Sequence, residues 1–221
     1  MFEAVIFDWD GTLADTSQVV VASFQKALSD IHCKISGEFI ERRIGIGSKE
    51  TFREILQASK MRFDETLIKS LAEKKIQTEI KLSGDVKLFD GSLELLESLQ
   101  GKLKLGLASM NDREVIDHML KTTNTQRFFD ATLTANDISN SKPDPEILFK
   151  CALKLGTRPE RCVVVEDSIF GVGAAKNARM SCIAVQTGIY SRTELVNAGA
   201  DLIVSSLTKK EAILCFAKID L

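Results

Sequence analysis

The stretch AVIFDWDGTL, residues 4–13, lies near the start of the chain and gives the clearest indication of the fold. Its first four residues are apolar and end abruptly at Asp8, which is typical of a short buried strand. Asp10 follows two residues later, and Gly11 then allows the backbone to turn and to expose its amide groups. Because ligands of open α/β sheets bind beyond the carboxyl ends of the strands, we expect a functional site at Asp8 and Asp10.

Short apolar runs recur further along the chain, and helical patterns separate them. These runs are also predicted as strands, and they cover residues 103–108, 131–134, 162–165, 182–185 and 202–204. Residues 115–120 and 147–155, between these runs, carry apolar side chains on one helical face. This alternation predicts the α/β class, with a Rossmann-like parallel sheet covered by helices on both sides.

Residues 16–84 break this alternation. Their apolar side chains recur at helical spacing, and no strand-like run interrupts them. We therefore expect a helical cap over residues 16–84, inserted into an α/β core that is built from residues 1–15 and 85–221. Within the cap, the pair Lys74-Lys75 is expected on a solvated helix face.

The composition excludes several classes of function. The 29 basic and 31 acidic residues give a formal net charge of −2, which provides no field to attract nucleic acid or an anionic membrane. No apolar stretch approaches the roughly 18 residues that a membrane span requires, and the N-terminus lacks the basic start of a secretion signal. The five scattered cysteines fit reduced thiols, so we expect a cytoplasmic protein, and nothing in the pattern demands more than a monomer. With only two histidines, the chain is expected to use carboxylates, lysines and bound metal.

Polar residues also lie beside two of the later predicted strands. Ser109 and Asn111 follow one of them, and Glu166 and Asp167 follow another. Lys142 precedes the helix that leads into the second of these strands. Because the carboxyl ends of parallel strands meet at one edge of a sheet, we expect all these side chains to face one cleft together with those of the N-terminal motif.

Carboxylates gathered in one cleft repel each other and do not all ionise unaided. A divalent cation that prefers oxygen ligands, such as Mg²⁺, resolves this repulsion. A carboxylate nucleophile that approaches a phosphate dianion also meets a repulsion of about 8 kcal/mol at about 4 Å and an effective dielectric constant of about 20. Mg²⁺, Lys142 and backbone amides would offset it. The pattern therefore predicts phosphoryl transfer to an aspartate.

These residues resemble the haloacid dehalogenase superfamily. Its four motifs stand in order as Asp8-Trp9-Asp10-Gly11-Thr12-Leu13, Ala108-Ser109, Ser141-Lys142-Pro143 and Glu166-Asp167-Ser168. The resemblance covers the whole chain and is strongest to the β-phosphoglucomutase and phosphoglycolate phosphatase branch with a small helical cap. It implies a Mg²⁺-dependent phosphatase that acts on a small phosphorylated metabolite of the sugar phosphate or phosphoglycolate type.

By that resemblance, Asp8 is the nucleophile that becomes an aspartyl-phosphate, and Asp10 is the general acid and base. The implied phosphate-binding residues are Ser109, Lys142, Asn111 and Thr12. The implied Mg²⁺ ligands are the carboxylates of Asp8 and Asp167 and the backbone carbonyl of Asp10, with Glu166 as a further ligand or a supporting partner. The implied substrate-facing residues of the cap are Arg43, Ser48 and Lys49.

Three alternatives remain open at this point. A sugar-phosphate mutase shares the motifs, but the β-phosphoglucomutases carry a cap histidine where this chain has Val20. A phosphoacceptor module of the receiver type also combines these residue types, although its acidic pair follows the first strand rather than a later one. A metabolite-binding protein without catalysis would not require both Asp8 and Asp10.

Overall fold

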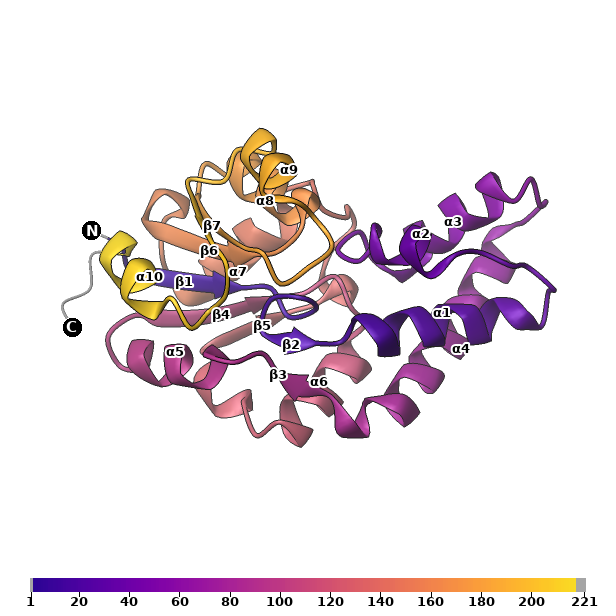
Figure 1. Cartoon of the computed structure of the whole chain (residues 1–221), viewed down its shortest axis with the longest axis horizontal. Coiled ribbons are helices and arrows are strands. Elements are labelled where there is room, and N and C mark those ends of the chain that lie inside the picture. Colours follow the sequence, from indigo (N-terminus) through magenta and orange to yellow (C-terminus); the bar gives the residue numbers. More distant parts are fainter. Residues whose placement is uncertain (1, 218–221) are drawn as a thin grey trace.

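The computed structural model describes residues 2–217 and places an α/β core beside a cap of helices (Figure 1). A six-stranded sheet in the order β5-β4-β1-β6-β7-β8 forms the centre of the core, and its neighbouring strands pair in parallel. The strands are β1 Ala4–Phe7, β4 Lys104–Ala108, β5 Ala131–Leu133, β6 Cys162–Glu166, β7 Ser181–Val185 and β8 Leu202–Val204. The predicted α/β class with a Rossmann-like parallel sheet is confirmed.

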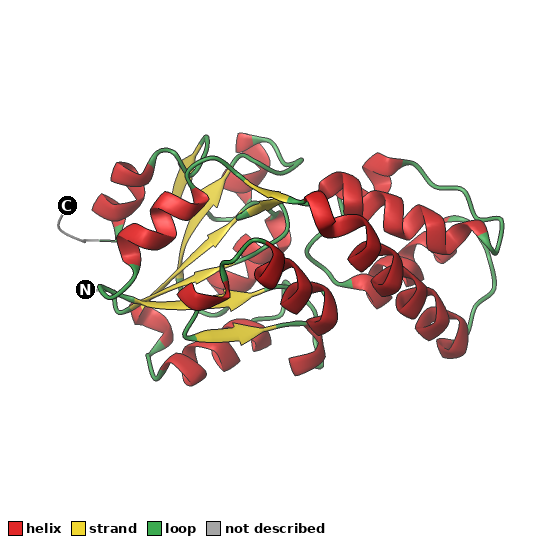
Figure 2. Cartoon of the chain, turned by 90° about the horizontal axis from the view of Figure 1, so that it is seen from below, coloured by secondary structure: helices red, strands yellow, loops and turns green. Residues whose placement is uncertain are grey.

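Helices cover both faces of this sheet (Figure 2). They are α5 Ser92–Leu99, α6 Arg113–Thr122, α7 Glu146–Leu155, α8 Ile169–Asn177, α9 Arg192–Asn197 and α10 Lys210–Phe216. Short 3₁₀ turns join several of the elements: Ser83–Asp85, Gln126–Phe128, Ala135–Asp137 and Pro159–Arg161. Among the described residues, no helix combines the length and the apolar character needed to cross a membrane.

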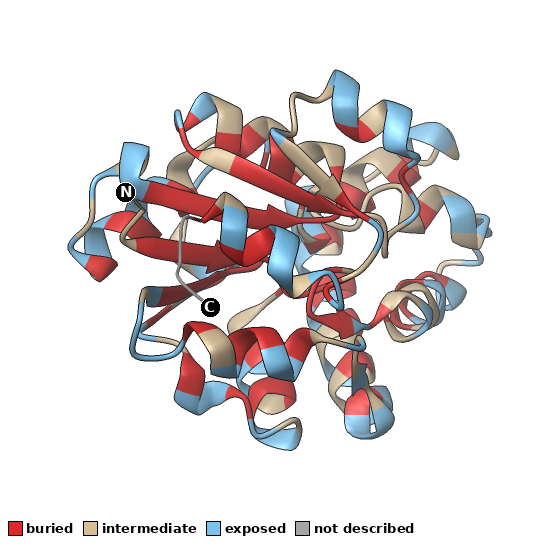
Figure 3. Cartoon of the chain, turned by 60° about the vertical axis from the view of Figure 1, so that its left-hand side comes forward, coloured by how far each residue is buried: buried red, intermediate tan, exposed pale blue. Residues whose placement is uncertain are grey.

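The central strands are buried on both faces, which explains why they are continuous apolar runs in the sequence (Figure 3). In β1, Val5 and Phe7 pack into the cluster under α5, α6 and α10. Ala4 and Ile6 point the other way, into the cluster under α7, α8 and α9. This double packing fixes β1 in the middle of the sheet and holds the residue that follows it, Asp8, at the carboxyl edge.

The cap contains the helices α1 Ser17–Ser29, α2 Gly37–Glu41, α3 Ser48–Ala58 and α4 Glu65–Leu82. It has a hydrophobic cluster of its own, which includes Phe24 and Phe52 with ring centroids 4.7 Å apart. The chain leaves the core through β2 Ala14–Asp15 and returns through β3 Lys87–Leu88, and these two short strands pair in an antiparallel ribbon. The cap is therefore attached to the core by two adjacent strands.

The expectation of a solvated face at Lys74-Lys75 is wrong for Lys75, which is only 2% exposed. The buried positions of α4 follow the helical repeat and are Ile68, Leu71, Ala72, Lys75 and Glu79. The apolar stripe at the start of α4 thus continues into a lysine and a glutamate. Burial of these two charged groups is possible because they contact each other.

Candidate active site

The site lies where β1, β4 and β6 end. Phe7, the last residue of β1, pairs with Leu107 of β4 and Val165 of β6, so the three strands end at the same level. The predicted residues Asp8, Ser109, Glu166 and Asp167 are at or directly after these ends, and all are buried. The alignment of the strand ends therefore brings together residues that are far apart in the sequence.

Lys142 enters this group from the loop before α7. Its Nζ lies 2.7 Å from Asp8 Oδ1 and 2.7 Å from Glu166 Oε1, and it donates a hydrogen bond to the carbonyl oxygen of Ala108 at 2.9 Å. Burial alone would lower the pKa of Lys142, but the carboxylates of Asp8 and Glu166 outweigh it and raise the pKa. The lysine therefore stays protonated and holds Asp8 in a fixed position.

Three carboxylates lie close together beside this ammonium group. Asp8, Glu166 and Asp167 each offer an oxygen atom, and these oxygens lie within 4.8 Å of one another. Burial raises the pKa of Asp8 to about 8, with Glu166 adding repulsion and Lys142 opposing it. Burial, followed by the charges of Glu166 and Asp8, also raises the pKa of Asp167 well above its usual range. The cluster thus has the oxygen donors that a divalent cation requires, and a shortage of positive charge.

Glu166 has protein partners on both oxygens. Its Oε1 contacts Lys142, and its Oε2 accepts hydrogen bonds from the backbone amides of Asp167 and Ser168, both at 3.1 Å. The Ser168 hydroxyl also donates to Oε2 at 3.0 Å. Glu166 therefore orients Lys142 and shapes the turn that carries Asp167.

Gly11 and Thr12 position Asp167. Gly11 has a φ of +80°, and a Cβ atom added to it would lie 2.4 Å from Asp167 Oδ2, so both the conformation and the space require glycine. The Thr12 hydroxyl donates to Asp167 Oδ1 at 2.9 Å. The structure thus directs Thr12, predicted to bind phosphate, toward the acidic cluster.

Asp10 lies in the same cleft, and its carboxylate is held by three side chains. The Thr16 hydroxyl donates to Oδ1 at 2.7 Å, the Ser109 hydroxyl to Oδ2 at 3.4 Å, and the Asn111 amide to Oδ2 at 3.3 Å. Ser109 also accepts the backbone N–H of Asn111 at 3.0 Å. The predicted residues Ser109 and Asn111 are therefore brought to Asp10, while the contribution of Thr16 was missed by the sequence reasoning.

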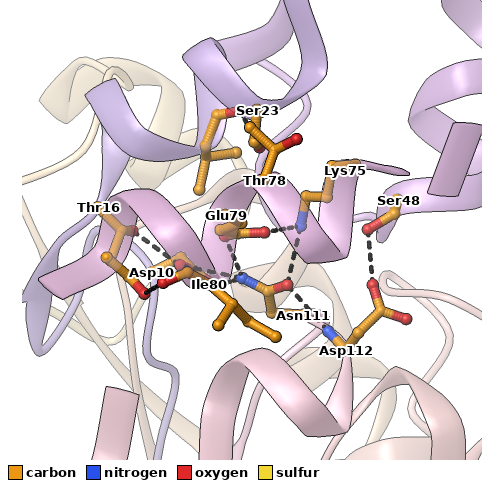
Figure 4. A network of polar contacts seen from close by, with 12 residues as sticks. Asp10, Thr16, Ser23, Ser48, Lys75, Thr78, Glu79, Ile80, Asn111 and Asp112 are labelled. Atoms are coloured by element: carbon orange, nitrogen blue, oxygen red, sulfur yellow. Dashed lines mark hydrogen bonds and ion pairs between the residues drawn. The ribbon is translucent and has the colours of Figure 1, made fainter. Parts of the chain in front are cut away.

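The cap contributes two further residues that sequence reasoning missed, Lys75 and Glu79 of α4 (Figure 4). Lys75 Nζ donates to Asn111 Oδ1 at 2.9 Å, and Asn111 Nδ2 donates to Glu79 Oε1 at 2.8 Å. Lys75 and Glu79 also form an ion pair. Burial alone would lower the pKa of Lys75, but Glu79 and Asp112 raise it, so the ammonium form is favoured. The helical repeat through Ile68 and Ala72 was the signal that could have found both residues.

The predicted cap residues divide into two groups. Arg43 and Ser48 line the cleft above Asp8 and Asp10, and the Ser48 hydroxyl crosses to the core and donates to Asp112 Oδ2 at 2.9 Å. Lys49 is exposed and lies along the neighbouring groove between α3 and the 135–145 segment. The structure therefore brings Arg43 and Ser48 to the site and leaves Lys49 beside it.

The fold and the site together define a class of protein: an α/β enzyme with an aspartate-rich centre beneath a helical cap. The model of the family described as "Haloacid dehalogenase-like hydrolase" matches residues 5–185. The chain belongs to this family, and the prediction that it is a hydrolase is confirmed.

Full-length relatives agree with this assignment. A protein of Thermotoga maritima named "Phosphorylated carbohydrates phosphatase" is 32% identical over 216 residues, which cover 96% of each chain. The crystal structure of a hydrolase from Pseudomonas syringae has a TM-score of 0.89 at 26% identity and covers 97% of this chain and 98% of its own. A β-phosphoglucomutase from Clostridium difficile has a TM-score of 0.87 at 28% identity, with 99% and 98% coverage. Core and cap are thus both shared with these proteins.

Proposed function

We propose that this protein is a Mg²⁺-dependent phosphatase that hydrolyses a small phosphomonoester through an aspartyl-phosphate on Asp8. The observation that carries this proposal is the position of Asp8. Its carboxylate lies at the floor of the cleft, 2.7 Å from the ammonium group of Lys142, with Asp10 in the same cleft. A carboxylate nucleophile, a cation for the phosphoryl oxygens and a second carboxylate for proton transfer are the groups that this chemistry needs.

In the first step, an oxygen of Asp8 attacks phosphorus, and the bond from phosphorus to the ester oxygen breaks. Asp10 gives its proton to that oxygen as the alcohol leaves. In the second step, Asp10 removes a proton from water, which attacks the phosphorus and releases inorganic phosphate and Asp8. Lys142 and the Ser109 hydroxyl stabilise the phosphoryl oxygens in both steps. Thr16 and Asn111 orient Asp10 by their hydrogen bonds.

Mg²⁺ is the metal that the donor set favours, because the available ligands are hard carboxylate and carbonyl oxygens. The carboxylates of Asp8 and Asp167 and the backbone carbonyl of Asp10 would hold it, with Glu166 as a further ligand or a partner of Lys142. Burial and the neighbouring carboxylates raise the pKa values of Asp8 and Asp167, and a bound cation would favour their ionised forms. When bound, the ion supplies charge stabilisation to the phosphoryl group.

A phosphorylated sugar or a similar small metabolite is the proposed substrate, and we propose no nucleic acid or membrane partner. The name of the Thermotoga maritima relative supports a carbohydrate phosphate. The β-phosphoglucomutase neighbour keeps a mutase as the second candidate. Val20 lines the cleft where those mutases carry a histidine, which favours the phosphatase.

Release of inorganic phosphate from p-nitrophenyl phosphate and from a panel of sugar phosphates tests this proposal. We expect Mg²⁺-dependent turnover by the wild-type protein, and a loss of at least about 10³-fold in Asp8→Asn, because the amide is no nucleophile. A chelator should abolish turnover, and added Mg²⁺ should restore it. Residual activity of more than a few per cent in Asp8→Asn contradicts the proposal. The mutase would be favoured if the protein isomerised a sugar phosphate, required a bisphosphate activator for this reaction, and released little inorganic phosphate.

A further inference from the structure

Lys75 brings a positive charge to the cap wall of the cleft, and Glu79 neutralises it there. Lys75 lines the cleft above Asp8 and Asp10, and its ammonium group is paired with the Glu79 carboxylate. The two residues are 2% and 0% exposed, so water screens neither charge effectively. Asn111 joins the pair by accepting a hydrogen bond from Lys75 and donating one to Glu79 (Figure 4). The pair therefore presents no net charge to a bound substrate.

Arg43, another cation on the cap wall of the cleft, is neutralised in the same way. Its Nε lies 2.5 Å from Glu54 Oε2, and its Nη1 donates to the carbonyl oxygen of Phe39 at 3.0 Å. The guanidinium group also stacks on the Phe39 ring, 3.4 Å from its centroid. Both of these cap cations thus already have a carboxylate partner within the protein.

The hydroxyl groups on this wall are engaged as donors. Ser48 donates to Asp112 Oδ2 at 2.9 Å, and Thr51 donates to the carbonyl oxygen of Gly47 at 2.9 Å. Both residues line the cleft, and with their hydrogens engaged their oxygens are left as acceptors. Acceptors suit the hydroxyl groups of a substrate, whereas they repel carboxylate or phosphate oxygens.

We propose that Glu79 sets the charge selectivity of the cap by neutralising Lys75. The cleft then takes phosphomonoesters with an uncharged, hydroxylated leaving group and discriminates against substrates with a second anionic group. This inference rests on the phosphatase function proposed above and makes it more specific. Glu79 and Lys75 are specificity-determining residues, and the chemical step remains with Asp8 and Asp10.

Two esters of similar size that differ in one group provide the test. Glycerol 3-phosphate ends in a hydroxymethyl group, and 3-phosphoglycerate ends in a carboxylate. The quantity measured is the ratio of kcat/KM for 3-phosphoglycerate to kcat/KM for glycerol 3-phosphate. We expect the wild-type protein to prefer glycerol 3-phosphate. Lys75 and Arg43 are each paired with a carboxylate of the protein, so neither is left to pair with the carboxylate of 3-phosphoglycerate.

Charge-changing variants should shift this ratio in a fixed order. Glu79→Gln leaves Lys75 uncompensated and keeps the hydrogen-bond acceptor for Asn111, so the ratio should rise by about tenfold, which is about 1.4 kcal/mol. Lys75→Gln leaves the carboxylate alone, so the ratio should fall. The double variant Lys75→Gln/Glu79→Gln is neutral again and should lie within about threefold of the wild-type ratio.

Glu73→Gln is the matched control, because Glu73 lies on the same helix and pairs with Lys69 at the exposed surface. Its ratio should equal that of the wild-type protein. A change of less than about threefold in Glu79→Gln, or a shift toward glycerol 3-phosphate, overturns the inference. If burial of an unpaired lysine prevents Glu79→Gln from folding, the fall in Lys75→Gln and the recovery in the double variant decide the question.

A binding measurement separates this inference from the proposed function. In an Asp8→Asn background, calorimetric titration gives Kd values for glycerol 3-phosphate and 3-phosphoglycerate without turnover. Glu79→Gln should shift the ratio of these Kd values toward 3-phosphoglycerate. A wild-type protein that releases phosphate from no ester contradicts the phosphatase, whereas an unshifted Kd ratio contradicts the role of Glu79.

Discussion

Two sides of the same cleft differ in how their charges are balanced. The core edge consists of Asp8, Lys142, Glu166 and Asp167, and the cap wall carries Arg43 and Lys75. At the core edge, the ammonium group of Lys142 pairs with the carboxylates of Asp8 and Glu166, and the carboxylate of Asp167 lies beside them. On the cap wall, Lys75 is matched by one carboxylate of its own. Charge is therefore left uncompensated on one side of the cleft and is balanced on the other.

This difference separates chemistry from selection. Uncompensated carboxylates attract a divalent cation, and the cation in turn attracts a phosphoryl group. A balanced wall adds no such attraction and leaves recognition to hydrogen bonds and shape. Substitutions at the core edge should therefore change the rate of the reaction, and substitutions on the cap wall should change which ester is preferred.

After the loss expected for Asp8→Asn, the next largest effect on turnover is expected for Asp10→Asn. The amide can still accept the hydrogen bond from Thr16, but it cannot transfer a proton, so turnover should fall by about 10²- to 10⁴-fold. Substrates with good leaving groups, such as p-nitrophenyl phosphate, should be less affected in the first step. Asp117→Asn on the exposed face of α6 is the control, and steady-state phosphate release is the measurement. Unchanged turnover in Asp10→Asn would assign Asp10 a structural role only.

The shortage of positive charge at the core edge should also appear in the stability of the metal-free protein. Because burial raises the folded-state pKa of Asp8 from its ordinary value of 3.8 to about 8, the folded protein binds this proton more tightly than the unfolded chain. This contribution to stability is full below about pH 4 and is lost as the pH rises through about 8. Lys142 does not reverse the trend, because its raised pKa gives a constant contribution within this window.

Thermal unfolding of the chelated protein should therefore occur at a lower Tm at about pH 8.5 than at about pH 5.5, and Mg²⁺ should raise Tm more at the higher pH. Each 1 kcal/mol corresponds to about 2 to 4 °C for a chain of this size. Asp8→Asn is the control and should show a weaker dependence of Tm on pH. If Tm depended on pH identically in the two proteins, Asp8 would not be the group whose raised pKa lowers stability at high pH.

The smallest effect is expected at the surface contact between cap and core. Arg42 and Glu194 form an ion pair at 3.1 Å, with side chains 39% and 36% exposed. Arg42→Gln should change the free energy of unfolding by less than about 1 kcal/mol, because exposed ion pairs contribute little. Denaturant titration measures this change. A loss of several kcal/mol would show that the cap is held by this contact and not by the buried network at Asn111.

The sequence predicted the core edge well because its residues lie in short motifs at strand ends. Asp8 and Asp167 each follow a recognisable apolar run, and parallel strands must bring those ends together, while Lys142 stands in the short motif before α7. The cap wall was harder to predict, because Lys75 and Glu79 reach the site through hydrogen bonds with Asn111. Asn111 lies 36 residues from Lys75 and 32 residues from Glu79 in the sequence. A lysine in a helix is usually solvated, and the burial of Lys75 against Glu79 shows only in the structure.

Chemical trapping of the phosphoenzyme is the sharpest test of Asp8 as the nucleophile. Protein is mixed with Mg²⁺ and a sugar phosphate, quenched during turnover, and treated with borohydride, which reduces an acyl phosphate to an alcohol. Mass spectrometry of the peptide that contains residues 4–13 should then show homoserine in place of Asp8, and only when substrate and Mg²⁺ are both present. Full phosphate release with no reduction at Asp8, or with reduction at another carboxylate, would contradict the assignment of Asp8 as the nucleophile.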